Sequence, residues 1–364
     1  MESTGRRRME ASGGERPDGQ RPGVPDGLTQ PLPADRQGSI QEIDYEARHY
    51  INAARQLVSS RFVDPAEAGR EVVRGEPIRK RCSLYLPAGY EAAPADARCD
   101  VLYLLHGVGG DHREWLDGSG QAGGRPLLAA ILDRLIAAGD IPPTIVVFPN
   151  GRSAVDWTDR SFNTEGTNML GFYYFDYELR HDLIPFIDAR YRTKAAAASG
   201  VPGGDGQGGR SHRALAGLSM GGMQALNLGL GGFRHDSAVF AGGASRYGNG
   251  LVPTVPAPGM TDLFSAVGAF SNAPTSSGGQ RLGASIRAAG FAVRQLMLVC
   301  GDEDLLVQSS FEEALDGLKE AAGERLGSLL REIVPGGKHD FGVWTYAAYR
   351  FLLAAFGTSG STGN

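Results

Sequence analysis

Short apolar runs alternate with amphipathic segments along most of the chain. The runs at 81–90, 100–107 and 144–151 have strand length, and each leads into a turn of proline or glycine. Residues 125–139 instead place leucine and isoleucine side chains on one face at helical spacing. Strands that alternate with helices in this way predict an α/β fold, with a mostly parallel central sheet and helices on both faces.

The second half of the chain continues the alternation. A helix is expected at 172–192, where Pro185 must kink it or start a fresh turn. A strand, a tight glycine turn and a helix follow at 211–230, and a strand at 295–304. The chain then predicts a helix at 310–323, a strand at 329–337 and a final helix at 341–356. A capping box from Ser310 to Glu313 is expected to start the first of these helices. The segments 237–245 and 264–273 compete for the strand that follows the 211–230 unit.

The same patterns divide the chain into one domain with two tails. Residues 1–38 are rich in glycine, proline and polar residues, so we expect a disordered tail. The domain itself spans 39–357, interrupted by glycine-rich insertions near 194–210 and 238–260, and 358–364 form a flexible C-terminus. Disorder is the favoured reading of the first insertion.

Composition and charge exclude several classes of function. The formal net charge of -5 over 364 residues argues against nucleic acid and anionic membranes as partners. No apolar run approaches the length of a membrane-spanning helix, and no apolar segment follows the early arginines, so a cytoplasmic location is expected. The three cysteines are too few for a disulfide framework and are expected to be free or buried thiols. The oligomeric state is left open.

The segment Gly217-Leu218-Ser219-Met220-Gly221 fits G-x-S-x-G, the turn that presents a nucleophilic serine at the end of a strand. Because the chain has 53 glycines, the pattern alone could arise by chance, and its context must decide. It follows an apolar strand and opens an apolar helix, which is the setting that this mechanism requires. We therefore predict Ser219 as the nucleophile.

Serine needs a base, and in this architecture the acid and then the histidine follow the serine along the chain. Asp304 comes just after an apolar strand, and His339 lies in a turn after the next one. His339 would take the serine proton while Asp304 orients the imidazole. Asp302, Glu303 and Asp340 are neighbouring rivals of Asp304, and position alone leaves that choice open.

An oxyanion hole requires two amide donors, one from the residue after the nucleophile and one from the loop after an early strand. The sequence offers Met220 for the first and Val108, within His106-Gly107-Val108-Gly109-Gly110, for the second. His106 comes too early for a catalytic base, so a structural role beneath this loop is expected. No grouping of histidines suggests a metal, and no phosphate-binding glycine motif suggests a nucleotide, so no cofactor is predicted.

Substrate contacts are expected near the same loop. Gly107 is one candidate, and the tryptophans Trp115 and Trp157 are others, since a planar acyl group gains from stacking on an aromatic ring. For each tryptophan, packing in the core or on the surface is the favoured alternative.

At these residues the chain resembles the esterase D-like α/β-hydrolases, and among them the feruloyl esterases of carbohydrate esterase family 1. The likeness covers about 77–357 and is carried by LYLPAGY, VLYLLHGVGGDHREW, HDLIPFIDARYRT, SHRALAGLSMGGMQALNLGL, FSAVGAFSNAP, LVCGDEDLLV and PGGKHDFGVW. It places Ser219, Asp304 and His339 on the family's nucleophile, acid and base, and it favours 264–273 over 237–245 as the contested strand. The two insertions depart from the family pattern.

The resemblance implies a cofactor-independent serine esterase acting through an acyl-enzyme. Its expected substrates are ferulate, related hydroxycinnamate or acetate esters of plant cell-wall sugars, taken as small molecules or oligosaccharides. Other activities of the same family remain open: an acetylxylan or other short-acyl esterase, a thioesterase or an acyltransferase. A hydrolase fold that has lost catalysis and serves as a binding protein is the alternative outside enzymes.

Overall fold

The computed structural model describes residues 22–58, 69–70, 75–163, 166–199, 208–234 and 255–358. Its centre is an eight-stranded sheet in the order β1-β2-β6-β3-β7-β10-β11-β12. The strands are β1 (Ser39–Arg48), β2 (Pro77–Leu86), β3 (Asp100–Leu105), β6 (Thr144–Phe148), β7 (Arg213–Leu218), β10 (Ala266–Phe270), β11 (Val293–Gly301) and β12 (Leu326–Val334). The pairings from β6 to β12 are parallel, and β2 is antiparallel to both β1 and β6.

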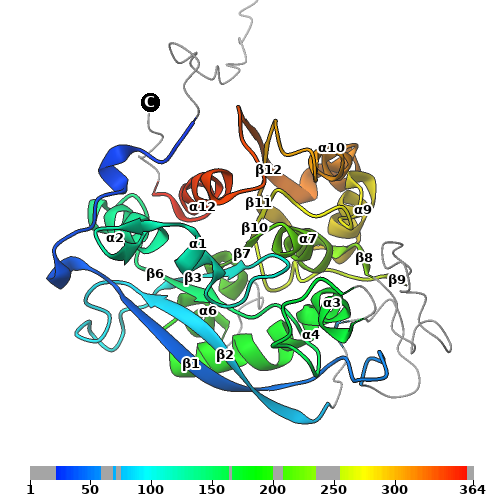
Figure 1. Cartoon of the computed structure of the whole chain (residues 1–364), viewed down its shortest axis with the longest axis horizontal. Coiled ribbons are helices and arrows are strands. Elements are labelled where there is room, and N and C mark those ends of the chain that lie inside the picture. The colour runs from blue at the N-terminus through cyan, green and yellow to red at the C-terminus, as the bar shows by residue number, and fades with distance from the viewer. Residues whose placement is uncertain are drawn as a thin grey trace, which may run out of the picture.

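Helices cover both faces of this sheet, as the sequence predicts. One face packs against α1 (Glu114–Gly118), α2 (Leu127–Ala138) and α12 (Phe341–Phe356). The other packs against α5 (Ile184–Arg190), α7 (Met220–Leu226), α9 (Gly279–Ala289), α10 (Gln308–Leu315) and α11 (Leu318–Ala322). Figure 1 shows α2 and α12 on one side of the strands and α7 and α9 on the other.

The side chains of the central strands alternate between the two cores. In β3, Val101 and Tyr103 belong to one apolar cluster and Leu102 and Leu104 to the other. All six residues of β3 are buried, because helices cover both faces of the strand. This explains why the apolar runs of the sequence are continuous at these strands.

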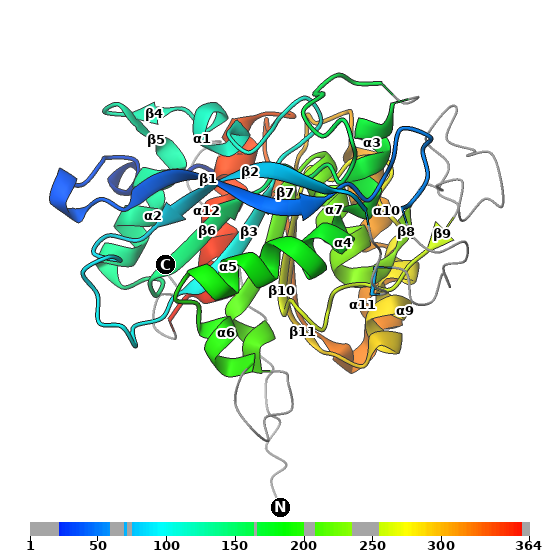
Figure 2. The ribbon, with the colours of Figure 1, turned by 90° about the horizontal axis from the view of Figure 1, so that it is seen from below.

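The edge strand β1 was not predicted. Its residues alternate between polar and half-buried positions, so it carries no continuous apolar run. It pairs with β2 along ten residues, from Ser39 opposite Leu86 to Arg48 opposite Pro77. Figure 2 shows this pair crossing the parallel strands at a steep angle.

Several boundaries differ from expectation. The expected tail 1–38 includes two 3-10 turns, at Asp26–Leu28 and Ala34–Arg36, and 1–21 lie outside the described residues. Within the first insertion, Lys194–Ser199 form helix α6 and Gly208–His212 a 3-10 turn, whereas 200–207 and most of the second insertion, 235–254, are not among the described residues. The sequence could not show helix α6, because a short alanine-rich segment forms only a weak helix unless it packs against another element.

The predicted helix at 172–192 is broken into shorter pieces. A 3-10 turn (Phe172–Tyr174), helix α4 (Phe175–Glu178) and a π-helical turn (Leu179–Leu183) precede α5, and Pro185 lies in the first turn of α5. Proline is tolerated there because the first amides of a helix have no partner within it. Pro185 therefore starts a new turn, one of the two outcomes expected.

The predicted capping box is wrong. Helix α10 begins at Gln308, so Ser310 lies inside it, and its hydroxyl donates to the carbonyl oxygens of Asn272 and Val307. The contested strand is β10, within 264–273, while 237–245 lie outside the described part of the chain.

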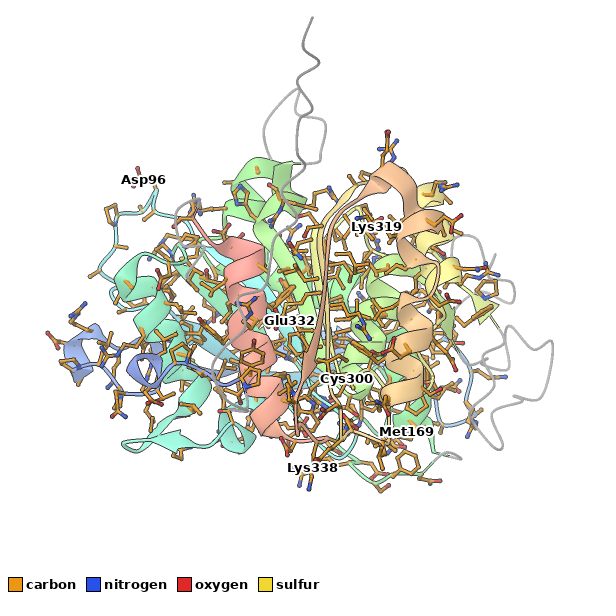
Figure 3. The ribbon with its side chains drawn as sticks, turned by 90° about the horizontal axis from the view of Figure 1, so that it is seen from above. Asp96, Met169, Cys300, Lys319, Glu332 and Lys338 are labelled. Atoms are coloured by element: carbon orange, nitrogen blue, oxygen red, sulfur yellow. The ribbon has the colours of Figure 1, made fainter. Side chains whose placement is uncertain are left out.

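The carboxyl ends of the parallel strands meet at one end of the molecule. Figure 3 shows Cys300, near the end of β11, and Lys338, just after β12, on the same side as Met169. Asp96, which precedes β3, and Lys319, which precedes β12, lie at the opposite end. Within the described ranges no helix is long and apolar enough to cross a bilayer. All three cysteines are free and buried.

Candidate active site

Ser219 lies at the turn between β7 and α7, with a strained backbone. Its φ of 51° and ψ of -116° are unfavourable for a side chain with a Cβ. Hydrogen bonds hold it there, because its amide donates to the carbonyl oxygen of Phe270 at 2.9 Å and its own carbonyl accepts from the amide of Ala273 at 3.0 Å. The side chain is thereby fixed at the carboxyl end of the sheet.

Two glycines of the motif allow this turn to close. A Cβ on Gly217 would lie 2.5 Å from the backbone carbonyl of Gly221, and one on Gly221 would lie 2.6 Å from the carbonyl oxygen of His106. Any larger side chain would separate β7 from α7 or α7 from β3. The G-x-S-x-G spacing is therefore a packing requirement of this elbow.

The predicted triad residues form a continuous chain of hydrogen bonds. The Nε2 atom of His339 lies 3.1 Å from the Ser219 Oγ, and its Nδ1 atom lies 2.9 Å from Oδ2 of Asp304. Asp304 is buried, with 1% of its surface exposed, and Ser219 is 7% exposed. Since a carboxylate can only accept, Nδ1 carries the proton and Nε2 is free to accept the one on Ser219.

Contacts between two loops bring the acid and the imidazole together. The amide of Glu303 donates to the carbonyl oxygen of Gly337 at 2.9 Å, and that of Asp302 donates to Val334 at 3.2 Å. A Cβ on Gly301 would lie 2.1 Å from the Gly337 oxygen, so the two backbones pass in direct contact. The loops after β11 and β12 are therefore joined side by side.

The geometry separates Asp304 from its three rivals. Asp302 and Glu303 are exposed, and Glu303 faces Lys338 at 3.7 Å. Asp340 caps α12, where its carboxylate accepts from the amides of Gly342 and Val343. Asp304 is the one carboxylate of these four that contacts His339 in the structure described.

Trp344, one turn into α12, packs against the imidazole of His339. The two rings meet edge to face, with centroids 4.9 Å apart and planes at 90°. Aromatic pairs favour this geometry, so the contact with Trp344 helps to fix the orientation of the imidazole ring. From the sequence, Trp344 is a candidate for contact with an acyl ring, with packing in the last helix as the favoured alternative, and its contact with His339 is not predicted. Its position five residues after His339 in a helix was the available signal.

The glycine loop after β3 lies directly against the nucleophile. A Cβ on Gly107 would lie 3.1 Å from the Ser219 Cβ and 3.7 Å from its Oγ. Val108 packs against the apolar cluster that contains Met220, and Met220 begins α7, whose first amides have no partner within the helix. The two residues predicted to supply amide donors are thus brought to the same place as Ser219.

His106 holds this loop from beneath, as expected. Its Nε2 accepts from the amide of Gly151 at 2.9 Å, so the proton is on Nδ1, which donates to the carbonyl oxygen of Gly107 at 2.7 Å. Burial, and then the charge of Arg152, lower the pKa of His106 to about 3. The ring is neutral and serves as a bridge between two loops.

Glu114 and Arg152 hold the same loop and were not predicted. The Oε2 atom of Glu114 accepts from the amide of Gly107 at 2.7 Å, and Arg152 donates from Nη1 to the carbonyl oxygen of Gly110 at 2.9 Å. Burial raises the pKa of Glu114. Only the placement of Glu114 one helical turn beyond the glycines could have indicated its role.

The predicted aromatic contacts divide into one buried residue and one partly exposed residue. Trp115 is 1% exposed, donates to the carbonyl oxygen of Leu105 and packs on Phe270 and Phe341, so it is a core residue and the substrate prediction for it is wrong. Trp157 is half-buried and lines a separate cavity near Asp111.

Next to Ser219 lies a buried apolar cluster that is rich in aromatic side chains. Met220, Val108 and Ala273 pack into one cluster with residues that include Leu170, Phe172, Tyr173 and Tyr177. The cluster therefore packs beneath the serine turn as part of the core. Among the described residues no group of three metal-ligating side chains is found.

Comparison with known proteins matches this architecture. Residues 79–236 match the family model described as "Putative esterase". The chain is 36% identical over 144 residues to an endo-1,4-beta-xylanase/feruloyl esterase of Xylanibacter ruminicola, and 31% identical over 166 residues to endo-1,4-beta-xylanase Y of Acetivibrio thermocellus. The alignments cover 39% and 44% of this chain but 16% and 13% of those proteins, so the chain spans less than a fifth of their length.

Solved structures extend the likeness to nearly the whole chain. The feruloyl esterase module from Clostridium thermocellum, a serine-to-alanine mutant complexed with sinapinate, superposes with a TM-score of 0.57 at 20% identity, covering 95% of this chain and 96% of that one. A ferulic acid esterase from Anaeromyces mucronatus in complex with ferulic acid gives a TM-score of 0.57 at 18% identity, with 91% and 95% covered. The predicted α/β-hydrolase fold is confirmed.

Proposed function

We propose that this chain, an α/β-hydrolase whose central region matches an esterase family, is a serine carboxylic ester hydrolase that cleaves hydroxycinnamoyl esters of plant cell-wall sugars. The observation that carries the proposal is the hydrogen-bond chain from Ser219 through His339 to Asp304. The relatives named for feruloyl esterase activity support the acyl group.

The first half of the reaction forms an acyl-enzyme. As Ser219 Oγ attacks the ester carbonyl, its proton passes to Nε2 of His339, and the buried carboxylate of Asp304 stabilises the resulting imidazolium. The amides of Met220 and Val108 receive the charge that develops on the carbonyl oxygen. His339 then returns the proton to the leaving sugar hydroxyl.

The second half releases the acid. Water enters where the sugar leaves, His339 takes its proton, and the hydroxide attacks the acyl carbonyl to regenerate Ser219.

Initial rates with methyl ferulate and p-nitrophenyl acetate test this function. We expect both esters to be cleaved, methyl ferulate with the higher kcat/KM, and Ser219→Ala and Asp304→Asn to lower kcat by about 10⁴-fold each. Asp302→Asn, in the same turn but exposed, is the matched control and should retain wild-type rates. Cleavage of p-nitrophenyl acetate alone would indicate a short-acyl esterase, and unchanged rates for Ser219→Ala would exclude the mechanism.

A further inference from the structure

A cavity of about 390 Å³ is lined in part by residues of the loops that follow β3 and β6. Three segments enclose it: the paired strands β1 and β2, the loop after β3 and the loop after β6. Its wall includes Trp157, Asn150, Asp44, Asp111 and Arg160. None of these residues takes part in the reaction described above.

The topology places this cavity at the same end of the sheet as Ser219. Asp111 and Asn150 follow the carboxyl ends of β3 and β6, and β2, being antiparallel to β6, begins at that end. β3 lies between β6 and β7, so the loop after β6, which forms the nearer wall of the cavity, is two strand spacings from the end of β7. This is roughly 10 Å, the length of about two sugar units.

The aromatic wall of the cavity is held in place from behind. The Lys80 ammonium lies 5.6 Å from the centre of the Trp157 ring, and the Asn150 side chain donates to the Trp157 carbonyl oxygen at 3.2 Å. Lys80 is fully buried and is itself fixed by Glu178 at 2.7 Å. The ring of Trp157 therefore has a defined orientation, and it is partly exposed and lines the cavity.

The polar groups of the cavity are paired guanidinium and carboxylate groups. Arg160 contacts Asp111 at 2.9 Å, and Asp44 receives Arg79 at 3.1 Å and Arg81 at 2.8 Å. Arg160 and Asp111 neutralise each other, whereas Arg79 and Arg81 share Asp44, and Arg81 also faces Glu42 at 3.7 Å. Every one of these cations thus has a carboxylate partner, and the groups retain N–H donors and oxygen lone pairs. Fixed donors and acceptors beside an aromatic face suit a neutral polyol ring, whose C–H face stacks while its hydroxyls hydrogen-bond. A phosphate or other strong anion would instead require unpaired cations.

We propose that this cavity is a saccharide subsite that holds a neutral sugar unit of the chain on which the ester is carried, one or two units from the esterified sugar. The inference rests on the proposed function and deepens it, because it assigns recognition of the alcohol side of the ester. Trp157 supplies the stacking face, and Arg160 with Asp111 supplies hydrogen bonds. An oligosaccharide ester would thus contact both Ser219 and this cavity.

The test compares a ferulate ester of an arabinoxylo-trisaccharide with methyl ferulate. The measured quantity is the kcat/KM for the trisaccharide ester divided by the kcat/KM for methyl ferulate. For Trp157→Ala and Arg160→Ala we expect this ratio to fall about tenfold, because the KM for the trisaccharide ester rises. Trp157→Phe should restore most of the ratio. Arg331→Ala is the matched control, since Arg331 is also an exposed arginine paired with a carboxylate, Glu312 at 2.6 Å, but lies in β12 at the other edge of the sheet.

A binding measurement separates failure of the subsite from failure of the proposed function. Xylotriose without ferulate is titrated by calorimetry into Ser219→Ala and into the double variant that also carries Trp157→Ala. Heat of binding with the single variant, and loss of that heat with the double variant, would support the subsite whatever acyl group the enzyme cleaves. An unchanged ratio in both Trp157→Ala and Arg160→Ala, or equal binding to the two Ser219→Ala proteins, would overturn it. A larger loss with a uronate-bearing ester than with the neutral one would overturn the choice of a neutral sugar.

Discussion

The carboxylate of Glu114 accepts a hydrogen bond from the backbone amide of Gly107 at 2.7 Å. Gly107 is in van der Waals reach of Ser219, and the charge of Glu114 also acts on His339. Glu114 is therefore a positioning residue that shapes the glycine loop without reaching the substrate. Its carboxylate is occupied by the Gly107 amide, whereas the imidazole of His339 is hydrogen-bonded to Asp304.

Glu114→Gln tests this relationship. The amide side chain keeps the shape of Glu114 but forms a weaker hydrogen bond to Gly107, because charge-assisted bonds are about twice as strong as neutral ones. We expect kcat to fall about tenfold with KM within twofold of wild type, as measured on methyl ferulate. Asp117→Asn, in the same helix and paired with Arg113, is the control. A change in KM alone would contradict a role in positioning the loop.

The strained backbone of Ser219 predicts an inverted stability order between two inactive variants. With φ at 51° and ψ at -116°, the position favours glycine, although glycine elsewhere destabilises a structured segment relative to alanine. We expect Ser219→Gly to have a free energy of unfolding about 1 kcal/mol higher than Ser219→Ala, as measured by urea denaturation. The reverse order would show that the turn is not strained.

Much of this architecture is readable from the sequence because the central strands are buried on both faces. Such strands appear as continuous apolar runs, and the strand, serine turn and helix at 211–230 lie where expected. Chain order then points to His339 and a carboxylate near 302–304. Only the folded structure distinguishes Asp304 from its neighbours, because the choice depends on which side chain faces inward, and that follows from the contact between Gly301 and Gly337.

The features that the sequence did not predict depend on contacts between distant segments. The edge strand β1 has no apolar run, Trp115 is defined as core by Phe270 and Phe341, and Glu114 is defined by its bond to Gly107. The local signals are weak: the placement of Glu114 after the glycines is one, and core packing was the favoured alternative for Trp115. The position of Ser310 inside α10 likewise follows from its hydrogen bond to Asn272, which is far away in the sequence.

The buried pair of Lys80 and Glu178 predicts a large loss of stability when one partner is removed. The two charges are 2.7 Å apart and have no exposed surface, and Glu178 also accepts from the hydroxyl of Ser153. Lys80→Met leaves a buried carboxylate without its cation, which costs about 3–5 kcal/mol of unfolding free energy. Lys80→Met with Glu178→Gln should recover at least half of that loss in urea denaturation. Additive losses would contradict coupling between the two groups.

His106 predicts a dependence of stability on pH. Its pKa is lowered to about 3 by burial, whereas in the unfolded chain it has the ordinary value near 6.5. Between these values the unfolded chain binds one more proton than the folded one, so this residue lowers the free energy of unfolding as pH falls from about 6.5 towards 3, by up to about 1.4 kcal/mol per pH unit.

His106→Gln, whose side chain has no proton to gain, separates this contribution from that of the carboxyl groups. Urea denaturation of both proteins at pH 6, 5 and 4 should give a shallower decline for the variant, although the variant starts from a lower stability because it loses a bridge between Gly107 and Gly151. The carboxyl groups titrate in both proteins and cancel in the difference between the curves. Parallel curves would mean that His106 gains its proton in the folded state as readily as in the unfolded chain. They would contradict the structure, in which the Nε2 atom of His106 accepts a hydrogen bond from the Gly151 amide and so carries no proton.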